Sequence, residues 1–493
     1  MLASVLPAAV QGLAAEPVAP AVETVFIREH KDSSGRAWQR VAIGGLADGD
    51  GYFARAIGQG SGIEGLVDDA GSDLWTFTDA DLGQIHGQAR IALSNVDDGR
   101  GGGEWIAVFG GGHGATPGQA WLFVLFIDRG IDGWESGDFV KIPAGIAVQP
   151  EQDGQTAASN ALGEPALVDT DLNGTADLAY AGDLRGNLYR FELSGRDPSA
   201  WRVVRLFQAT YGEPTETVQP ITQRPFVAMH PGHGEFLVVF GTGSVRAVEG
   251  MAPTDIQSIY GIWDPGESDP ATAWLDARRL RLVGRVLVNV VDESAGSFET
   301  RRMLTGAPFE YARHAPGRTG VYGWYIDLDM PRASQTLQGN PNPDTCGQSP
   351  PDPQYPGERL AGRAVPAGRA LFMATAIPGT VGGCGDAPAG MVLAVDIATG
   401  DGPVGGVFDV NEDGHLDAAD LSGVAGETPV SGVMLDGSAF SGTPGEPILV
   451  SAKDGSATLT VGQGDDALSL GIGGAAAPRT GRLSWREISE ATH

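Results

Sequence analysis

Apolar runs of strand length recur along the whole chain, and most of them end in glycine, a turn or an acidic residue. Examples are WIAVFGGG at 105–112, FLVVFGTG at 236–243 and ALFMATAIPG at 370–379. A second apolar run follows each of them, as AWLFVLFID at 120–128 follows the first. Short β-branched and aromatic runs bounded by turn residues are typical of strands, and long helical patterns are almost absent. The pattern predicts an all-β protein.

This pair of runs recurs about seven times at irregular spacing, as expected of a radial β repeat. The other runs lie at 41–57, 74–77, 178–183, 186–191, 258–264, around 305–312, 321–329, 390–400 and, irregularly, 430–462. A four-stranded blade has two apolar faces, which only neighbouring blades can cover. We therefore expect a β-propeller of about seven blades.

Two stretches interrupt the repeat and are expected to be insertions. Residues 265–300 include ARRLRLVGRVLVNVV, which indicates a strand pair outside the blade pattern. Residues 331–356 are rich in Pro, Asn and Gln and predict a long surface loop. We expect residues 1–37 to be an N-terminal segment with a truncated first blade, and residues 38–493 to be the propeller.

Composition supports many turns and excludes several classes of function. The chain has 74 glycines and 32 prolines, and the glycines interrupt apolar runs without a collagen period. The net charge of −30 disfavours nucleic acid, whose phosphates need Lys and Arg, and favours divalent cations. The sequence contains no phosphate-binding loop motif.

The sequence predicts neither a signal peptide nor a membrane span. Residues 1–22 have no basic residue ahead of their apolar part and so do not predict a signal peptide. No apolar run is long enough for an integral membrane span. The two cysteines, Cys346 and Cys384, are compatible with one disulfide in an exported protein and equally with two free thiols.

The segment VDTDLNGTADLAYAGDLRGNLYRF, at 168–191, carries the clearest candidate chemistry. Its acidic and amide residues alternate, with a glycine after the central asparagine, before two short strands joined by a turn at 185–187. Alternating carboxylates on a flexible loop are the ligands that Ca²⁺ prefers. The candidate ligands are Asp169, Asp171, Asn173, Thr175 through its carbonyl, and Asp177. The alternative is a surface turn, in which Asp, Asn and Gly are favoured for conformational reasons.

A second loop, DVNEDGHLDAAD at 409–420, fits the EF-hand spacing more fully. Its candidate ligands are Asp409, Asn411, Asp413, His415 through its carbonyl, Asp417 and Asp420, with Gly414 at the sharp turn. The last ligand position holds Asp instead of Glu, whose longer reach favours bidentate ligation, so a smaller ion is also compatible. A short helix is expected after Asp417. The alternative is again a structural turn.

Other clusters favour structural interpretations. His230 and His233 form an H-x-x-H without a third ligand nearby in sequence, which favours a turn over a metal site. The loop acids are expected to be turn residues, although a carboxylate pair could hydrolyse glycosides; they are Asp79, Asp81, Asp97 and Asp98. The strand tryptophans are expected to pack blades, with a ring around a quinone as the alternative; they are Trp75, Trp105, Trp121, Trp263 and Trp324.

Several sequence motifs, taken in their order along the chain, resemble the C-terminal β-propeller domain of the PilY/PilC family of type IV pilus adhesins and biogenesis factors. The resemblance covers nearly the whole chain. It rests on 38–57, LWTFTDADLGQIHGQARIAL at 74–93, 105–112, 169–193, 238–244, 257–264, GWYIDLD at 323–329, GERL at 357–360 and GRLSWREI at 481–488.

The resemblance implies a non-enzymatic, calcium-binding propeller. In the family, the loop matching Asp169–Asp177 binds Ca²⁺, and ion occupancy is linked to the balance of pilus extension and retraction, twitching motility and adhesion. The implied partners are pilins or minor pilins, and host or abiotic surface ligands. The implied location is the cell surface, as part of a fimbrium or associated with the outer membrane after export. The alternatives are a propeller enzyme, such as a quinoprotein dehydrogenase or a glycosidase, and a truncated fragment with little activity.

Overall fold

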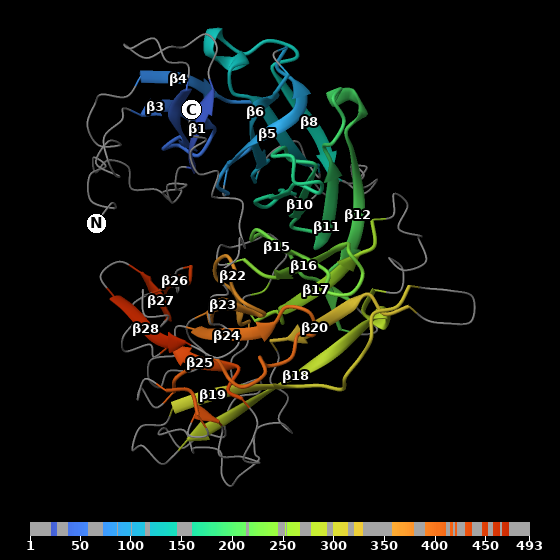
Figure 1. Ribbon diagram of the computed structural model, residues 1–493, viewed down its shortest axis with the longest axis vertical. Helices are drawn as coiled ribbons and strands as arrows, with labels where there is room; N and C mark the ends of the chain where they lie inside the picture. The colour runs from blue at the N-terminus through green and yellow to red at the C-terminus, as the bar shows by residue number, and fades with distance from the viewer. Residues whose placement is uncertain are drawn as a thin grey trace. The chain divides into compact units, whose positions relative to one another are not determined.

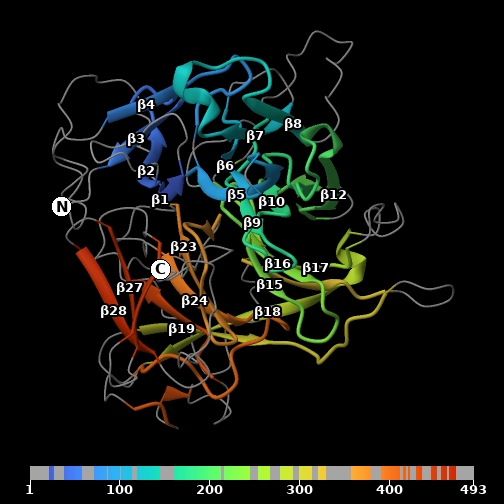
Figure 2. The same cartoon turned by 45° about the horizontal axis from the view of Figure 1, so that its top comes forward.

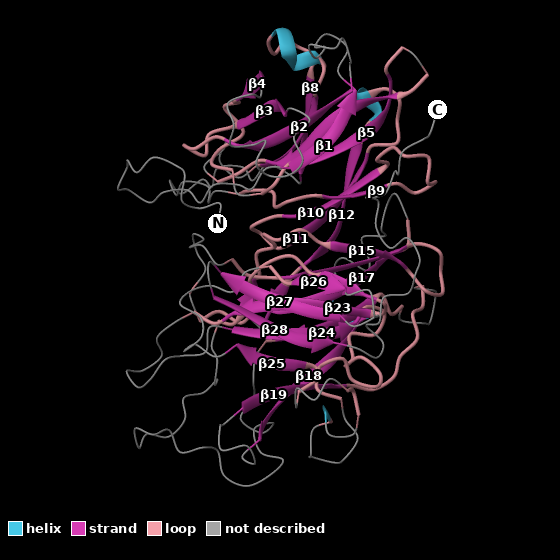
Figure 3. Cartoon of the chain, turned by 60° about the vertical axis from the view of Figure 1, so that its left-hand side comes forward, coloured by secondary structure: helices cyan, strands magenta, loops and turns pink. Residues whose placement is uncertain are grey.

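The structure is a computed structural model of the chain. It describes residues 21–26, 38–57, 72–85, 87–99, 101–113, 119–144, 160–212, 216–244, 252, 254–266, 278–292, 299–313, 320–328, 357–378, 390–410, 415–417, 420–421, 429–435, 446–451, 457–463 and 466–472. The described part of the chain is built almost entirely from β-strands, and its helical segments are 3-10 turns of at most four residues (Figure 3). The prediction of an all-β protein is therefore confirmed. The chain divides into two compact units, residues 1–283 with 310–328 and residues 284–309 with 329–493.

The first unit contains three successive four-stranded antiparallel sheets, each formed by strands that follow one another in the chain (Figure 1). The first sheet comprises β1 (Ala21–Phe26), β2 (Trp38–Gly45), β3 (Tyr52–Ile57) and β4 (Ser72–Phe77). The second comprises β5 (Arg90–Asp97), β6 (Gly103–Gly110), β7 (Ala120–Phe126) and β8 (Phe139–Ala144). The third comprises β9 (Ala166–Val168), β10 (Leu178–Gly182), β11 (Asn187–Glu192) and β12 (Arg202–Gln208).

Apolar side chains from both faces of the second sheet fill the spaces between these three sheets. On one face, Phe109 and Phe123 pack against Tyr52 and Phe77 of the first sheet. On the other face, Val108 and Phe126 belong to a core that includes Phe191 of the third sheet. A sheet with two apolar faces requires a cover on each side, which is the packing of propeller blades.

A fourth sheet of the first unit joins strands that are distant in sequence. It contains β15 (Phe226–Met229), β16 (Phe236–Gly241), β17 (Ser258–Asp264) and β20 (Gly323–Asp327) in that order. A two-stranded sheet, β13 (Thr210–Tyr211) with β14 (Thr217–Val218), precedes it in the chain.

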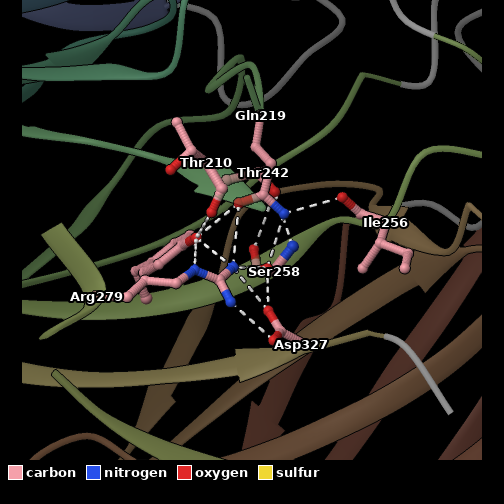
Figure 4. A network of polar contacts seen from close by, with 8 residues as sticks. Thr210, Gln219, Thr242, Ile256, Ser258, Arg279 and Asp327 are labelled. Carbon is pink, nitrogen blue, oxygen red and sulfur yellow. Dashed lines mark hydrogen bonds and ion pairs between the residues drawn. The ribbon is translucent and has the colours of Figure 1, made fainter. Parts of the chain in front are cut away.

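A partly buried polar network ties the 3-10 turn η4 (Arg278–Arg281) to this fourth sheet (Figure 4). The Arg279 guanidinium donates to Asp327 at 2.8 Å, to the Ser258 hydroxyl at 2.9 Å and to the Tyr260 hydroxyl at 2.7 Å. The Tyr260 hydroxyl in turn donates to Gln219 Oε1 at 2.6 Å, and burial raises the pKa of Tyr260. The network therefore satisfies polar groups that would be costly to bury unpaired.

The second unit holds two further sheets. In one, β18 (Leu282–Asp292), β19 (Glu299–Thr305), β25 (Gly432–Leu435), β24 (Gly390–Asp396) and β23 (Ala370–Ala376) pair in that order. The short strands β21 (Arg359–Leu360) and β22 (Val365–Ala367) both pair with β23. The other sheet comprises β26 (Ile448–Ser451), β27 (Ala457–Gln463) and β28 (Asp466–Ile472). An apolar core that includes Phe372, Val392 and Leu459 joins the two sheets.

Three sequence-based expectations about strands were wrong. ARRLRLVGRVLVNVV is not a strand pair: it forms η4 and then the single strand β18, whose partner is β19. The strand expected around 305–312 lies earlier in the chain, at Glu299–Thr305. The runs of the irregular seventh repeat do not pair with each other, since Gly432–Leu435 joins β24 while Ile448–Ser451 starts the last sheet.

Other expectations fall wholly or mostly outside the described residues. The loop predicted at 331–356, including Cys346, and the region of Cys384 are among them. The short helix expected after Asp417 also falls largely there, since only positions 420 and 421 of that stretch are described.

Candidate metal-binding loop

The loop from Asp169 to Asp177 connects β9 to β10 in the third sheet. Its ends are held together because the Asp177 amide donates to the Val168 carbonyl at 2.8 Å. Between them the backbone turns sharply, with positive φ at Leu172 (63°) and Gly174 (99°). Glycine takes this conformation without strain, whereas leucine takes it at a cost. The predicted hairpin follows directly, with β10 paired to β11.

The carboxylates of Asp169, Asp171 and Asp177 converge in this loop. One oxygen from each lies within 4.8 Å of the others, and among the described residues this is the one such group of three or more His, Cys, Asp or Glu side chains. Asp169 and Asp177 are buried, with 7% and 4% of their surface exposed, while Asp171 is exposed. The structure therefore brings together three of the five residues predicted as ligands of the first ion.

Hydrogen bonds within the loop order these side chains. Asp169 accepts from the amides of Asp171 and Leu172 through Oδ1, at 3.1 and 2.6 Å, and from the Gly174 amide through Oδ2 at 2.6 Å. Asp171 accepts from the backbone and side-chain amides of Asn173, at 3.2 and 3.0 Å. Asn173 Oδ1 accepts from the Thr175 amide at 2.8 Å. Each side chain stabilises the turn a few residues further on, as Asx turns do.

Asn95 is a residue of this site that the sequence did not reveal. It belongs to β5, in the neighbouring sheet, and its Nδ2 donates to Asp177 Oδ1 at 2.9 Å while its Oδ1 accepts from the Thr175 hydroxyl at 2.9 Å. Strand β5 runs beside this loop (Figure 2), where Leu93 and Thr175 form a parallel bridge. An asparagine within a strand of otherwise ordinary composition carries no local signal of such a contact.

The donor set fits a hard divalent cation. Every side-chain donor in the group is a carboxylate or amide oxygen, the type that Ca²⁺ and Mg²⁺ prefer. Within the described part of the chain, the ion pairs do not involve Asp169, Asp171 or Asp177, and hydrogen-bond donors offset the three carboxylates there. A bound divalent cation would add positive charge beside them.

The hairpin after the loop depends on a different acidic residue, Asp183. It is fully buried and accepts from the Asn187 amide at 2.8 Å, from Asn160 Nδ2 at 3.1 Å and from the Tyr189 hydroxyl at 3.0 Å. Burial raises the pKa of Asp183, and these donors oppose the rise. Asp183 therefore stabilises the turn of the YAGDLRGNLYRF segment.

The second predicted loop is described only in part. Asn411 and Asp413 lie outside the described residues, His415 and Asp417 are exposed, and Asp420 is buried. The Asp420 carboxylate accepts from the amides of Val410 at 2.7 Å and Asp417 at 2.9 Å, so it closes the loop from Asp409 onward.

The remaining clusters are used structurally. His230 Nδ1 accepts from the Gly232 amide at 3.1 Å, and the His233 ring stacks on Trp263 at 4.5 Å, as expected of a turn. Lys141 pairs with Asp79 at 3.0 Å and Asp81 at 2.7 Å.

The other loop acids and the tryptophans also have local roles. Asp97 and Asp98 accept from backbone amides in the β5–β6 turn. The tryptophans pack between or within sheets, as predicted: Trp75, Trp263 and Trp324 are buried, and Trp105 and Trp121 flank the first core.

The family of the chain follows from comparison with known proteins. Residues 21–298 match the family model described as the PilY1 beta-propeller domain. The chain belongs to the PilY1 β-propeller family. The match includes both β5 and the Asp169–Asp177 loop, and it confirms the resemblance inferred from the sequence motifs.

Individual PilY1 proteins are similar over most of the chain. A type IV pilus biogenesis factor PilY1 homolog of Xylella fastidiosa is 28% identical over 437 residues, which cover 84% of this chain and 25% of that protein. PilY1 of Pseudomonas aeruginosa PAO1 is 28% identical over 486 residues, covering 92% of this chain and 36% of that protein. The chain thus spans about a quarter to a third of the length of these relatives.

A solved structure agrees on the fold. The crystal structure of the P. aeruginosa PilY1 C-terminal domain matches with a TM-score of 0.65 at 24% identity, covering 92% of this chain and 83% of that one. The β-propeller prediction is confirmed by this match together with the PilY1 family model. Within the described residues, no helix has the length and hydropathy needed to cross a bilayer.

Proposed function

We propose that this chain is the calcium-binding β-propeller of a type IV pilus biogenesis factor. The observation that supports ion binding is the convergence of Asp169, Asp171 and Asp177 in a loop ordered by hydrogen bonds from its own backbone amides. Asn173 and the Thr175 carbonyl complete the set of oxygen ligands. The bound ion offsets two of the three negative charges and holds the entry to β10.

The pilus role rests on the membership of the family and on the names of the relatives. In this proposal, the propeller acts at the cell surface with pilins or minor pilins, without enzymatic activity. Ion occupancy adjusts the balance between pilus extension and retraction, and so affects twitching motility and adhesion.

A second ion belongs to the proposal at Asp409–Asp420. Its support is the EF-hand spacing and the buried Asp420 carboxylate, which brings the two ends of the loop together. The other predicted ligands are Asn411, Asp413, the His415 carbonyl and Asp417. Their oxygen chemistry suits Ca²⁺ or, because the last position is Asp, a smaller divalent cation.

Calorimetric titration of chelator-treated protein with Ca²⁺, and separately with Mg²⁺, tests the ion directly. The proposal expects two equivalents of Ca²⁺, one of which is lost in Asp177→Asn and the other in Asp420→Asn. Asp97→Asn is the matched control, because Asp97 is an exposed turn acid that accepts a backbone amide outside both loops. A parent protein that takes up no heat-detectable Ca²⁺ at millimolar concentration contradicts the proposal.

The pilus role needs a cellular test. We expect that this chain, replacing the corresponding domain of P. aeruginosa PilY1, supports twitching motility, and that Asp169→Asn in the same chimera reduces it. If the chimera is exported and stable but the cells show no twitching motility, the pilus role is contradicted. If the chimera and its Asp169→Asn variant support equal motility, the pilus role does not depend on ion binding.

A further inference from the structure

Asn95 lies where strand β5 loses its regular pairing with β6. The register of the two strands shifts between Leu93 and Asp97, so that Asn95 lies in an irregular segment. A bulge of this kind turns a side chain out of the normal alternation of a strand. Here the half-buried Asn95 side chain reaches the loop of the next sheet.

We propose that Asn95 is a positioning residue for the ion loop, through which ion binding and the attachment of the β5–β8 sheet to the β9–β12 sheet stabilise each other. The inference rests on the proposed ion at Asp169–Asp177. It adds a residue from another sheet and a mechanical consequence of ion binding.

The Asn95 amide contacts three consecutive residues of the loop. Its Nδ2 donates to Asp177 Oδ1 at 2.9 Å and to the Ala176 carbonyl at 3.3 Å, and its Oδ1 lies 2.9 Å from the Thr175 hydroxyl, whose one proton it shares with Asn173 Oδ1 at 2.6 Å. These partners fix the orientation of the amide, since a flipped amide would place its oxygen against a carboxylate. One side chain therefore holds two predicted ligand residues, Thr175 and Asp177.

The backbone strengthens the same junction. The Ala176 amide donates to the Leu93 carbonyl at 2.8 Å, beside the parallel bridge between Leu93 and Thr175. The loop is thus attached to β5 by main-chain and side-chain bonds within a few residues of the ligands. Because of these bonds, any movement of Asp177 or Thr175 toward an ion also displaces β5.

The hydrogen bonds also show which Asp177 oxygen remains available. Asp177 Oδ2 accepts from both the amide and the hydroxyl of Thr170, at 2.8 and 2.6 Å, which uses its two lone pairs. Asp177 Oδ1 accepts from Asn95 and keeps a second lone pair for a cation. Asn95 therefore orients the oxygen that serves as ligand, in the way that outer-shell partners orient metal-binding carboxylates.

Because coupling free energies are reciprocal, an ion that stabilises this arrangement also stabilises the contact between the sheets. Two variants separate this effect from ordinary structural stabilisation. Asn95→Ala removes the anchor. Asn95→Asp keeps the size and the acceptor for Thr175, but places a carboxylate against Asp177.

We expect Asn95→Ala to bind Ca²⁺ about tenfold more weakly, as is typical when an outer-shell partner is lost. Its Ca²⁺-induced rise in Tm becomes smaller than that of the parent. We expect Asn95→Asp to melt earlier in chelator and to gain more in Tm from Ca²⁺, since only a cation offsets the added charge. A purely structural Asn95 would shift Tm equally with and without ion in both variants.

Amide hydrogen exchange measures the stability of the contact between β5 and the Asp169–Asp177 loop. In the parent, Ca²⁺ is expected to slow exchange of the amides of residues 90–97, and this slowing is lost in Asn95→Ala. Asn160→Ala is the matched control, because the buried Asn160 bonds to Asp183 in the third sheet without touching the loop. It should lower Tm and leave Ca²⁺ affinity unchanged.

The outcomes are distinguishable. If the parent binds Ca²⁺ at this loop and both Asn95 variants match its affinity and Tm gain, the inference is wrong and the ion site stands. If Asn160→Ala weakens Ca²⁺ binding as much as Asn95→Ala, general loosening explains the effect and the inference is also wrong. If the parent binds no Ca²⁺ at all, the proposed function fails first. Should Asn95→Ala not fold, the isosteric Asn95→Asp carries the test.

Discussion

Arg190 and Asp264 form a buried ion pair between strands that are 74 residues apart in the sequence. One guanidinium nitrogen of Arg190 lies 2.6 Å from Oδ1 and 2.8 Å from Oδ2 of Asp264, and both side chains are almost fully buried. Tyr180 donates a further bond to Asp264 at 2.7 Å, and burial together with this carboxylate raises the pKa of Tyr180. The pair links the sheet that carries the Asp169–Asp177 loop to β17.

Breaking this pair on one side should be costly. We expect Arg190→Met to lower the free energy of unfolding by about 3–5 kcal/mol, because it leaves the Asp264 carboxylate buried without its cation. Chemical denaturation measures the change. In the double variant Arg190→Met with Asp264→Asn, part of the loss should be recovered; strictly additive losses would contradict the coupling.

Gly261 and Trp324 are directly opposed on β17 and β20, and no side chain fits at the glycine. A Cβ at Gly261 would lie 2.3 Å from the Trp324 indole. We expect Gly261→Ala to destabilise the protein by about 1–3 kcal/mol, as overpacking does. The same change in a Trp324→Leu background should cost clearly less, and an equal cost in both backgrounds would show that the indole is not the obstacle.

Leu172 is strained at the tip of the Asp169–Asp177 loop. Its φ is 63° and the residue is 81% exposed, so it adopts an unfavourable conformation while burying little apolar surface. Asparagine tolerates this conformation better, so Leu172→Asn should raise the free energy of unfolding by up to about 1 kcal/mol. Leu172→Ala retains the Cβ and the strain, and should not stabilise. Thermal denaturation in chelator compares the two, and equal effects would exclude strain as the cause.

His230 should make the protein sensitive to mild acid. Burial, with a contribution from His233, lowers the pKa of His230 to about 4 from its ordinary value of 6.5. The unfolded chain therefore binds a proton first, so stability is unaffected above pH 6.5 and falls as the pH decreases from 6.5 to about 4. His230→Phe keeps the ring packing and should flatten this part of the pH profile. A profile identical to that of the parent would contradict the assignment.

Much of the fold was visible in the sequence because strands leave a local pattern. The apolar runs around Phe109, Phe240 and Phe372 alternate with turns. Each run predicted a strand, and the structure contains all three strands. The hairpin at Leu178–Glu192 was also correctly placed, since its turn residues lie between two apolar runs. The sequence did not predict as well which strands share a sheet. The runs at 432–435 and 448–451 look alike but belong to different sheets.

The sequence by itself determined the all-β class, the repeat, and the acidic loop in which Asp169, Asp171 and Asp177 converge, because turn and ligand patterns are local. Only the tertiary structure decided which distant residues meet that loop and its sheet. Asn95 and Arg190 each look like an ordinary polar residue within a strand. Whether such a side chain faces solvent or a partner about 80 residues away depends on strand register and sheet packing, which no local pattern encodes.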